Sequence, residues 1–148
     1  MRRFQFPLEP ALKLRRRLEE QAQVELAEQQ RRLGEEEART QMLEREQRSH
    51  DHRRADLQRR AIQIEELAAA EQYSCTLSLA LEAQALKVRE AEARVAEARE
   101  LLQSRRAERE SIERLRERRL AEHHSEQLRG EQQSLDDASI LRWRRSES

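Results

Sequence analysis

Apolar positions recur along this chain at alternating spacings of three and four residues, which predicts long helices that pair through a coiled-coil seam. A first series runs from Ala22 to Ile64, but between Glu36 and Arg54 most of its steps carry charged or amide side chains. A second, cleaner series contains Leu77, Leu81, Gln84, Val88, Ala91, Val95, Ala98 and Leu102. We therefore expect weak pairing along the middle of the first helix and tighter pairing early in the second.

The second series is interrupted after Leu102. It meets Arg105 and Arg109, resumes at Ile112, and then needs a four-residue step to reach Leu120. A shift of this kind locally unwinds a coiled coil. The sequence therefore predicts a change in packing near these arginines.

The two series predict an all-α fold, a long antiparallel two-helix coiled-coil hairpin. A single helix of 148 residues would be over roughly 200 Å long, with most of its apolar stripe unpaired. β-branched Ile62 and Ile64 interrupt the charged helical pattern and favour a turn there, while Ser74 offers an alternative start for the second helix as an N-cap. The expected organisation is a single coiled-coil domain over 1–148, with helix 1 at about 8–60, the turn at about 59–66 and helix 2 at about 66–143.

Composition excludes a compact globular interior. Charged residues make up 41% of the chain and aromatic residues only 3%, so there is little large apolar surface to bury. Gly and Pro occur only twice each, and 30 basic residues balance 30 acidic ones, which favours helices over disorder. Zero net charge argues against a general nucleic-acid binder. The chain lacks an apolar run of membrane-spanning length and a secretory signal, so we expect a cytoplasmic protein.

Catalytic and metal-binding patterns are absent from the sequence. Adjacent His123 and His124 point about 100° apart on a helix, and His50 and His52 fail to converge for a similar reason. The single cysteine, Cys75, is expected to pack as a small apolar residue. Acid runs need a cleft to become catalytic, and a two-helix hairpin offers none. We expect no enzymatic activity, cofactor, bound metal or small-molecule substrate.

In an antiparallel hairpin the two chain ends meet. Residues 1–17 carry a net charge of +5 and residues 140–148 a net charge of +2. The same ends carry eight bulky apolar residues, which we predict to form one protein-binding tip: Phe4, Phe6, Leu8, Leu12, Leu135, Ile140, Leu141 and Trp143. Aromatic and arginine side chains are typical anchors of protein interfaces. The simpler alternative is a helix end whose basic residues compensate the dipole.

Both ends of the chain also resemble a known family. The run FQFPLEPALKLR at residues 4–15 and the run RGEQQSLDDASILR at residues 129–142 closely resemble the two ends of the FliJ family, coiled-coil proteins of the bacterial flagellar type III export apparatus. The resemblance implies an antiparallel two-helix coiled coil that is a monomer alone. It also implies a place at the inner face of the cell membrane at the flagellar base, reached through partners.

The resemblance further implies protein partners: the export ATPase FliI, the export gate protein FlhA and export chaperones. The predicted tip would bind FliI. The family's gate-binding face falls on Tyr73, Thr76, Ala80, Ala83 and Lys87 of this sequence. Three rival interpretations remain open: the equivalent stalk protein of a virulence-type secretion system, a structural coiled-coil scaffold, and a peripheral membrane or nucleic-acid binder acting through the basic tip.

Overall fold

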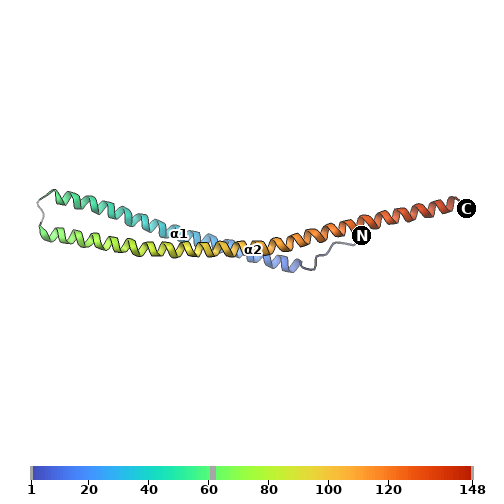
Figure 1. Ribbon diagram of the computed structural model, residues 1–148, viewed down its shortest axis with the longest axis horizontal. Coiled ribbons are helices and arrows are strands. Elements are labelled where there is room, and N and C mark those ends of the chain that lie inside the picture. The colour runs from blue at the N-terminus through green and yellow to red at the C-terminus, as the bar shows by residue number, and fades with distance from the viewer. Residues whose placement is uncertain (1, 61–62, 148) are drawn as a thin grey trace. The chain divides into compact units, whose positions relative to one another are not determined.

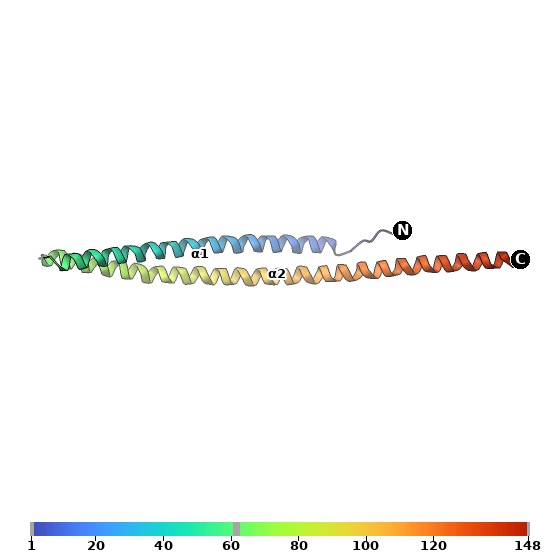
Figure 2. The same cartoon turned by 90° about the horizontal axis from the view of Figure 1, so that it is seen from above.

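Two long helices account for nearly all of the structure, a computed structural model that describes residues 2–60 and 63–147. Helix α1 spans Glu9–Gln58 and α2 spans Ile64–Ser146. The chain reverses between them, so α1 and α2 run antiparallel (Figures 1 and 2). The described residues contain no strand, and the predicted all-α hairpin is confirmed.

Local chemistry explains where the helices begin and end. Pro7 precedes α1, the Glu9 amide donates to the Phe6 carbonyl at 3.1 Å, and the Glu9 carboxylate favours the positive end of the helix dipole. Helix α2 opens on acidic residues and closes on arginines, the complementary arrangement at both ends. Ala61 and Ile62, within the stretch predicted to turn, lie outside the described residues. Ser74, the alternative N-cap, lies inside α2 and does not begin it.

The chain divides into two compact units, each built from part of α1 and part of α2. Unit 1 contains Met1–Glu19 and Ser104–Ser148, and unit 2 contains Glu20–Gln103. Each unit is described on its own below.

Unit 2 packs mainly through the second apolar series. The buried residues of α2 all lie in this unit: Ala70, Leu77, Gln84, Ala91, Val95 and Ala98. Between Glu36 and Arg54 the only buried residue is His50, whose Nε2 lies 2.9 Å from the Ala70 carbonyl oxygen. Small apolar side chains on α2 therefore supply most of the unit 2 core, and α1 adds little to it along its polar stretch.

Gln84 is the polar member of this seam. Its side-chain amide donates to the Glu36 carbonyl oxygen at 2.9 Å and to Glu36 Oε2 at 2.6 Å. Both donors of the buried amide are therefore satisfied, as burial of a polar group requires.

Unit 1 combines a small apolar core with ion pairs between the helices. Leu12 is fully buried and Phe6 is 7% exposed. Among the described residues, five ion pairs connect the N-terminal part of the chain to α2: Arg116–Glu9 at 3.1 Å, Arg16–Glu113 at 3.2 Å, Arg15–Glu108 at 2.7 Å, Arg106–Glu19 at 3.6 Å and Arg109–Glu19. Ion pairs between the helices therefore contribute much of the helix pairing in unit 1, whereas apolar contacts provide it in unit 2.

The predicted interruption at Arg109 is where this pairing is most buried. Glu19 is 8% exposed and faces Arg109, which also donates to Glu113 at 2.6 Å. The hydrogen bond that Arg109 donates to Glu19, together with the one it donates to Glu113, raises the Arg109 pKa despite burial. The charge of Arg109 at this seam position is therefore balanced by the carboxylates of Glu19 and Glu113.

Candidate functional site

The residues before α1 form a non-helical segment that lies along α2. We call residues 2–8 the N-terminal strap. It extends away from the first turn of α1 and lies beside α2 (Figure 2). His123 Nε2 lies 3.2 Å from the Arg2 carbonyl oxygen, and the Gln127 amide donates to the same oxygen at 3.3 Å. The Phe4 ring packs on the His123 ring with centroids 5.6 Å apart. The strap is therefore fixed to α2 at its beginning as well as at buried Phe6.

The prediction that the two chain ends form one tip is wrong. The strap reaches the level of His123 and Gln127, whereas α2 continues to Ser146 (Figure 1). The physical reason is length, because α1 has 50 residues and α2 has 83. We call Leu128–Ser146 the free end of α2. Its 19 residues span about 28 Å at 1.5 Å per residue.

One groove continues from the strap onto the free end. Arg2, His123 and Gln127 line it together with Gly130, Glu131, Ser134 and Leu135. It is a shallow surface feature and holds no enclosed cavity.

The eight residues predicted to bind the ATPase therefore fall into two groups. Phe6 and Leu12 are buried and Phe4 is half-buried, so they hold the strap and α1 to α2, while Leu8 beside them is 39% exposed. The other four lie on the free end and are 50–69% exposed: Leu135, Ile140, Leu141 and Trp143. Leu128, absent from the predicted set, joins them at 66% exposure. Sequence alone missed this division because it assumed that the two chain ends meet.

The predicted gate-binding residues lie on one face of α2 in unit 2. Tyr73, Thr76, Ala80, Ala83 and Lys87 follow three- and four-residue steps beside the buried seam, which places them in one stripe. Four of the five are exposed and Ala80 is half-buried. The structure therefore brings these side chains together on an accessible surface.

Tyr73 is held in place by α1. Its hydroxyl donates to Glu46 Oε1 at 3.1 Å, and its ring packs edge-on against His50 with centroids 4.8 Å apart. The hydrogen bond to Glu46 raises the Tyr73 pKa. A ring already fixed in the free protein loses less conformational entropy when a partner binds it.

Sequence reasoning missed two leucines next to this stripe. Leu79 and Leu86 are 60% and 59% exposed. A signal was available, because between Gln72 and Leu86 the only charged residue is Glu82, in a chain that is 41% charged. Exposed apolar side chains without surrounding charge indicate a binding surface.

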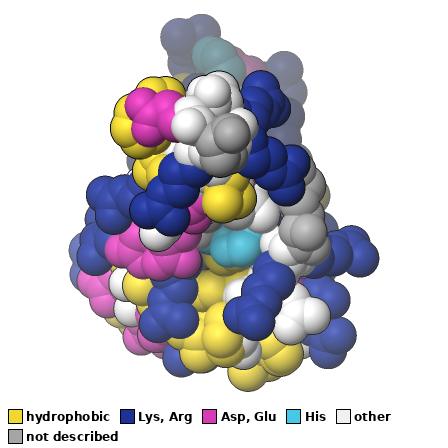
Figure 3. All heavy atoms as spheres, turned by 90° about the vertical axis from the view of Figure 1, so that its right-hand side faces the viewer, with side chains coloured by type: hydrophobic (Ala, Val, Ile, Leu, Met, Phe, Trp, Pro, Cys, Tyr) yellow, Lys and Arg dark blue, Asp and Glu magenta, His cyan; other side chains and the backbone are white. Residues whose placement is uncertain are grey.

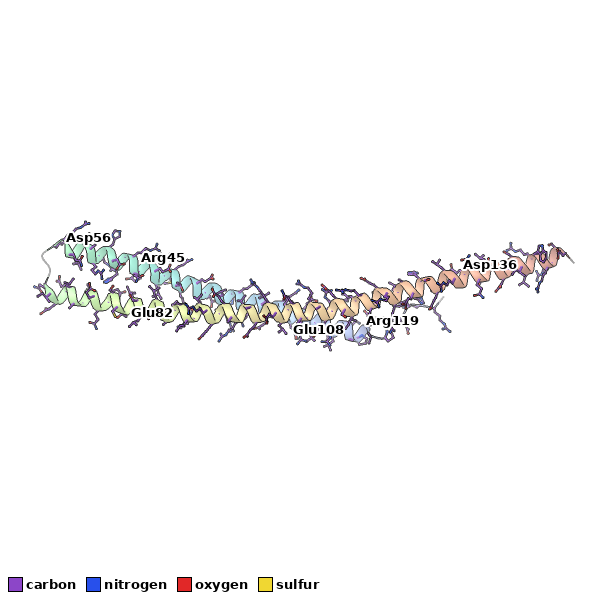
Figure 4. All side chains as sticks on the ribbon, viewed as in Figure 1. Arg45, Asp56, Glu82, Glu108, Arg119 and Asp136 are labelled. Carbon is purple, nitrogen blue, oxygen red and sulfur yellow. The ribbon has the colours of Figure 1, made fainter. Side chains whose placement is uncertain are left out.

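Charge is divided unevenly between the units. Unit 1 carries 17 Lys and Arg against 12 Asp and Glu, and unit 2 carries 13 against 18. Viewed from the end of α2, Lys and Arg side chains surround hydrophobic ones on several sides (Figure 3). Charged side chains also project outward along both helices, among them Arg45, Glu82 and, on the free end, Asp136 (Figure 4). Unit 1 is therefore the basic unit.

The described residues show no other chemical site. They contain no group of His, Cys, Asp and Glu side chains able to hold a metal ion. Over the same residues no helix is long and apolar enough to cross a membrane. Cys75 is exposed, so the prediction that it packs as a small apolar residue is wrong. Cys75 lies on the side of α2 that faces away from the seam, where no apolar partner among the described residues covers it.

Comparison with known proteins supports the family resemblance and the helical fold. A family model described as flagellar FliJ protein matches residues 4–148 and confirms the resemblance seen at the two chain ends. The solved structure of CT670 from Chlamydia trachomatis, described as a YscO homologue, is similar with a TM-score of 0.64 and 20% sequence identity, over 94% of each chain. That similarity supports the two-helix fold. No curated protein matches the sequence.

Proposed function

The chain belongs to the flagellar FliJ protein family, and we propose that it is a stalk that binds the flagellar export ATPase FliI and the export gate protein FlhA. As a family member it is a coiled-coil protein associated with type III export. The proposal adds the partners and the surfaces that meet them. It assigns the chain no catalytic step, and export chaperones are expected to bind it as well.

The observation that carries the ATPase assignment is the free end of α2. Leu141 and Trp143 are 58% and 61% exposed on a part of α2 that the strap does not accompany, and Trp143 lies between two arginines in the sequence. Burying a large aromatic side chain flanked by arginines is a common source of binding energy at protein interfaces. The basic character of unit 1 would also speed the encounter with an acidic surface.

The gate assignment rests on the low-charge stripe of α2 in unit 2. Tyr73 is fixed by Glu46 and His50, and Leu79 and Leu86 extend the exposed apolar surface beside it. This surface and the free end lie in different units. Two partners can therefore use separate residues, and the chain can transmit the state of one partner to the other through differential contacts.

The flagellar family model favours this assignment over a virulence-type stalk. A scaffold or filament component would instead form larger oligomers as concentration rises. Size-exclusion chromatography with light scattering separates these cases, and we expect a monomer at all concentrations.

ATPase stimulation tests the first contact. Purified FliI is assayed alone, with the wild-type chain, and with the double variant Leu141→Asp plus Trp143→Ala. We expect stimulation by the wild type and none by the double variant. The matched control is Leu14→Asp, since Leu14 is 53% exposed but lies on α1, and it should stimulate fully. Absence of stimulation by the wild type, or equal stimulation by the double variant, would refute the assignment.

Gate binding is tested separately by pull-down with the cytoplasmic part of FlhA. Ala83→Asp places a charge on the proposed stripe and should abolish capture. Ala121→Asp makes the same change at an exposed position of α2 in unit 1 and should not. Equal capture of both variants would remove the stripe from the proposal.

A further inference from the structure

Four residues of unit 2 contact one another across the hairpin, beside the buried seam. Glu46 and His50 lie one helical turn apart on α1, and Ala70 and Tyr73 lie one turn apart on α2. Tyr73 is 41% exposed, so part of its ring is open to a partner while α1 contacts the rest. The orientation of Tyr73 therefore depends on α1, although Tyr73 itself belongs to α2.

His50 supplies a rigid wall for the tyrosine ring. It is 7% exposed, and its Nε2 lies 2.9 Å from the Ala70 carbonyl oxygen. A carbonyl oxygen only accepts, so Nε2 carries the proton and donates it. The Tyr73 ring packs edge-on against this imidazole, with an angle of 77° between the two planes. The tyrosine ring therefore rests on a side chain that is itself held in one orientation.

Glu46 fixes the other end of the tyrosine side chain. Its Oε1 accepts a hydrogen bond from the Tyr73 hydroxyl at 3.1 Å and another from the Arg53 guanidinium at 2.9 Å. Arg53 lies seven residues further along α1, so it orients the carboxylate from the same helix. Held at both its ring and its hydroxyl, Tyr73 is confined to one rotamer.

The bond to Glu46 also decides what chemistry Tyr73 offers to a partner. A tyrosine hydroxyl has one proton to donate, and Glu46 already receives it. The other hydroxyl of the stripe, on Thr76, donates to the Gln72 carbonyl oxygen at 3.0 Å. The exposed surface around them is the flank of the tyrosine ring together with apolar side chains, Leu79, Ala83 and Leu86. A partner that fits this surface therefore presents apolar groups and not a hydrogen-bond acceptor.

We propose that Glu46 of α1 is a positioning residue for gate binding: against the wall formed by His50 it holds Tyr73 so that the ring, and not the hydroxyl, meets an apolar surface of FlhA. The inference rests on the proposed function, because it concerns the same stripe of α2. It adds a residue of α1 that acts through Tyr73, and the chemistry of the surface that the stripe meets. Fixing Tyr73 before binding removes the entropic cost of ordering it in the complex.

Titration of the cytoplasmic part of FlhA with the full chain tests the role of Glu46. Glu46→Ala removes the acceptor and should weaken binding by about three- to tenfold, the cost of ordering one side chain during association. Glu46→Gln keeps an acceptor oxygen and should stay within about twofold of the wild type. The matched control is Glu44→Ala, since Glu44 is exposed and residues two positions apart on a helix do not face the same side. It should bind as the wild type does, and equal weakening by Glu46→Gln and Glu46→Ala would overturn the positioning role.

A double-mutant cycle shows whether Glu46 acts through Tyr73. Tyr73→Phe keeps the ring and loses the hydroxyl, so it should weaken binding as much as Glu46→Ala does. The two changes combined should cost no more than either alone, because both remove the same hydrogen bond. Additive losses, or tighter binding by Glu46→Ala, would mean that Glu46 or the free hydroxyl meets FlhA directly, and would overturn the proposal.

Spectroscopy of the free chain adds a readout that does not depend on FlhA. Tyr73 is the only tyrosine of the sequence, so an alkaline titration followed by tyrosinate absorbance reports this residue alone. The hydrogen bond to Glu46 raises the Tyr73 pKa, and Glu46→Ala should return the midpoint toward about 10 while Glu44→Ala leaves it unchanged. An unchanged midpoint in Glu46→Ala would contradict the positioning role.

The same variants separate this inference from the proposed function. FlhA capture that Ala83→Asp abolishes and Glu46→Ala leaves at full affinity would overturn only the positioning role of Glu46. Failure of the wild type to bind FlhA would instead overturn the gate assignment itself.

Discussion

Leu12→Ala should destabilise unit 1 strongly, because Leu12 is the largest side chain in the described structure that is completely buried. Truncation to Ala removes the equivalent of three buried methylene groups, about 2.4 kcal/mol at about 0.8 kcal/mol each. Any residual cavity would add to this cost. A two-helix unit can close around a small void more easily than a compact core, so we expect about 2–3 kcal/mol in total.

Leu14→Ala is the matched control. Leu14 lies two residues further on in the same helix and is 53% exposed. Leu and Ala have similar helix propensities, so the two substitutions differ mainly in lost burial. We expect Leu14→Ala to cost about 1 kcal/mol or less.

Amide hydrogen exchange is the appropriate assay, because it reports each unit separately. Two to three kcal/mol corresponds to a loss of protection of about 30- to 160-fold at the amides of residues 9–19 and 104–120. Amides of unit 2 between Leu77 and Ala98 should change little. Equal loss for the two variants, or a loss spread evenly over both units, would refute the assignment of Leu12 as the apolar anchor of unit 1.

Three other outcomes can be checked by circular dichroism during denaturation. Burial raises the Glu113 pKa, but hydrogen bonds from its two arginine partners, Arg16 and Arg109, outweigh this and lower the pKa below the ordinary 4.5. The stabilisation that Glu113 contributes is therefore complete above about pH 4.5 and is lost as the pH falls further. A Glu113→Gln variant should accordingly show a flatter acid unfolding curve. Gly34→Ala and Gly130→Ala should each stabilise helix by about 0.5–1 kcal/mol, because an added Cβ meets no atom within 4 Å, and a lowered melting temperature would contradict this. Gln84→Leu should cost about 1–2 kcal/mol by removing two hydrogen bonds to Glu36, and a more stable variant would show that the seam prefers an apolar residue there.

Some features of the candidate surfaces could be predicted from sequence and others could not. The stripe from Tyr73 to Lys87 is a matter of spacing within one helix, so its shared face follows directly from the residue numbers. The contact of Tyr73 with Glu46 and His50 requires the register between α1 and α2. Nothing in the spacing along one helix specifies that register.

The grouping of Phe4, Phe6 and Trp143 shows the same limit. Their presence near the chain ends is a fact of sequence, and their common tip was an inference from the antiparallel hairpin, in which the chain ends were expected to meet. The structure instead buries Phe6, packs Phe4 on His123 and leaves Trp143 exposed on the free end. The length by which α2 extends beyond α1 and the strap depends on where the chain turns and on the course of the strap before α1.

The sequence by itself determined the two helices, the apolar seam of α2 and the absence of a compact core, because helix formation and amphipathic patterning depend on residues three and four positions apart. Tertiary structure decided the pairing of Glu19 with Arg109, the seating of the strap and the 28 Å or so of helix left beyond it. These depend on which residues meet across the hairpin. The pairing across the hairpin minimises the combined cost of buried charge and exposed apolar surface over the whole of unit 1, and no single segment of the sequence specifies that pairing.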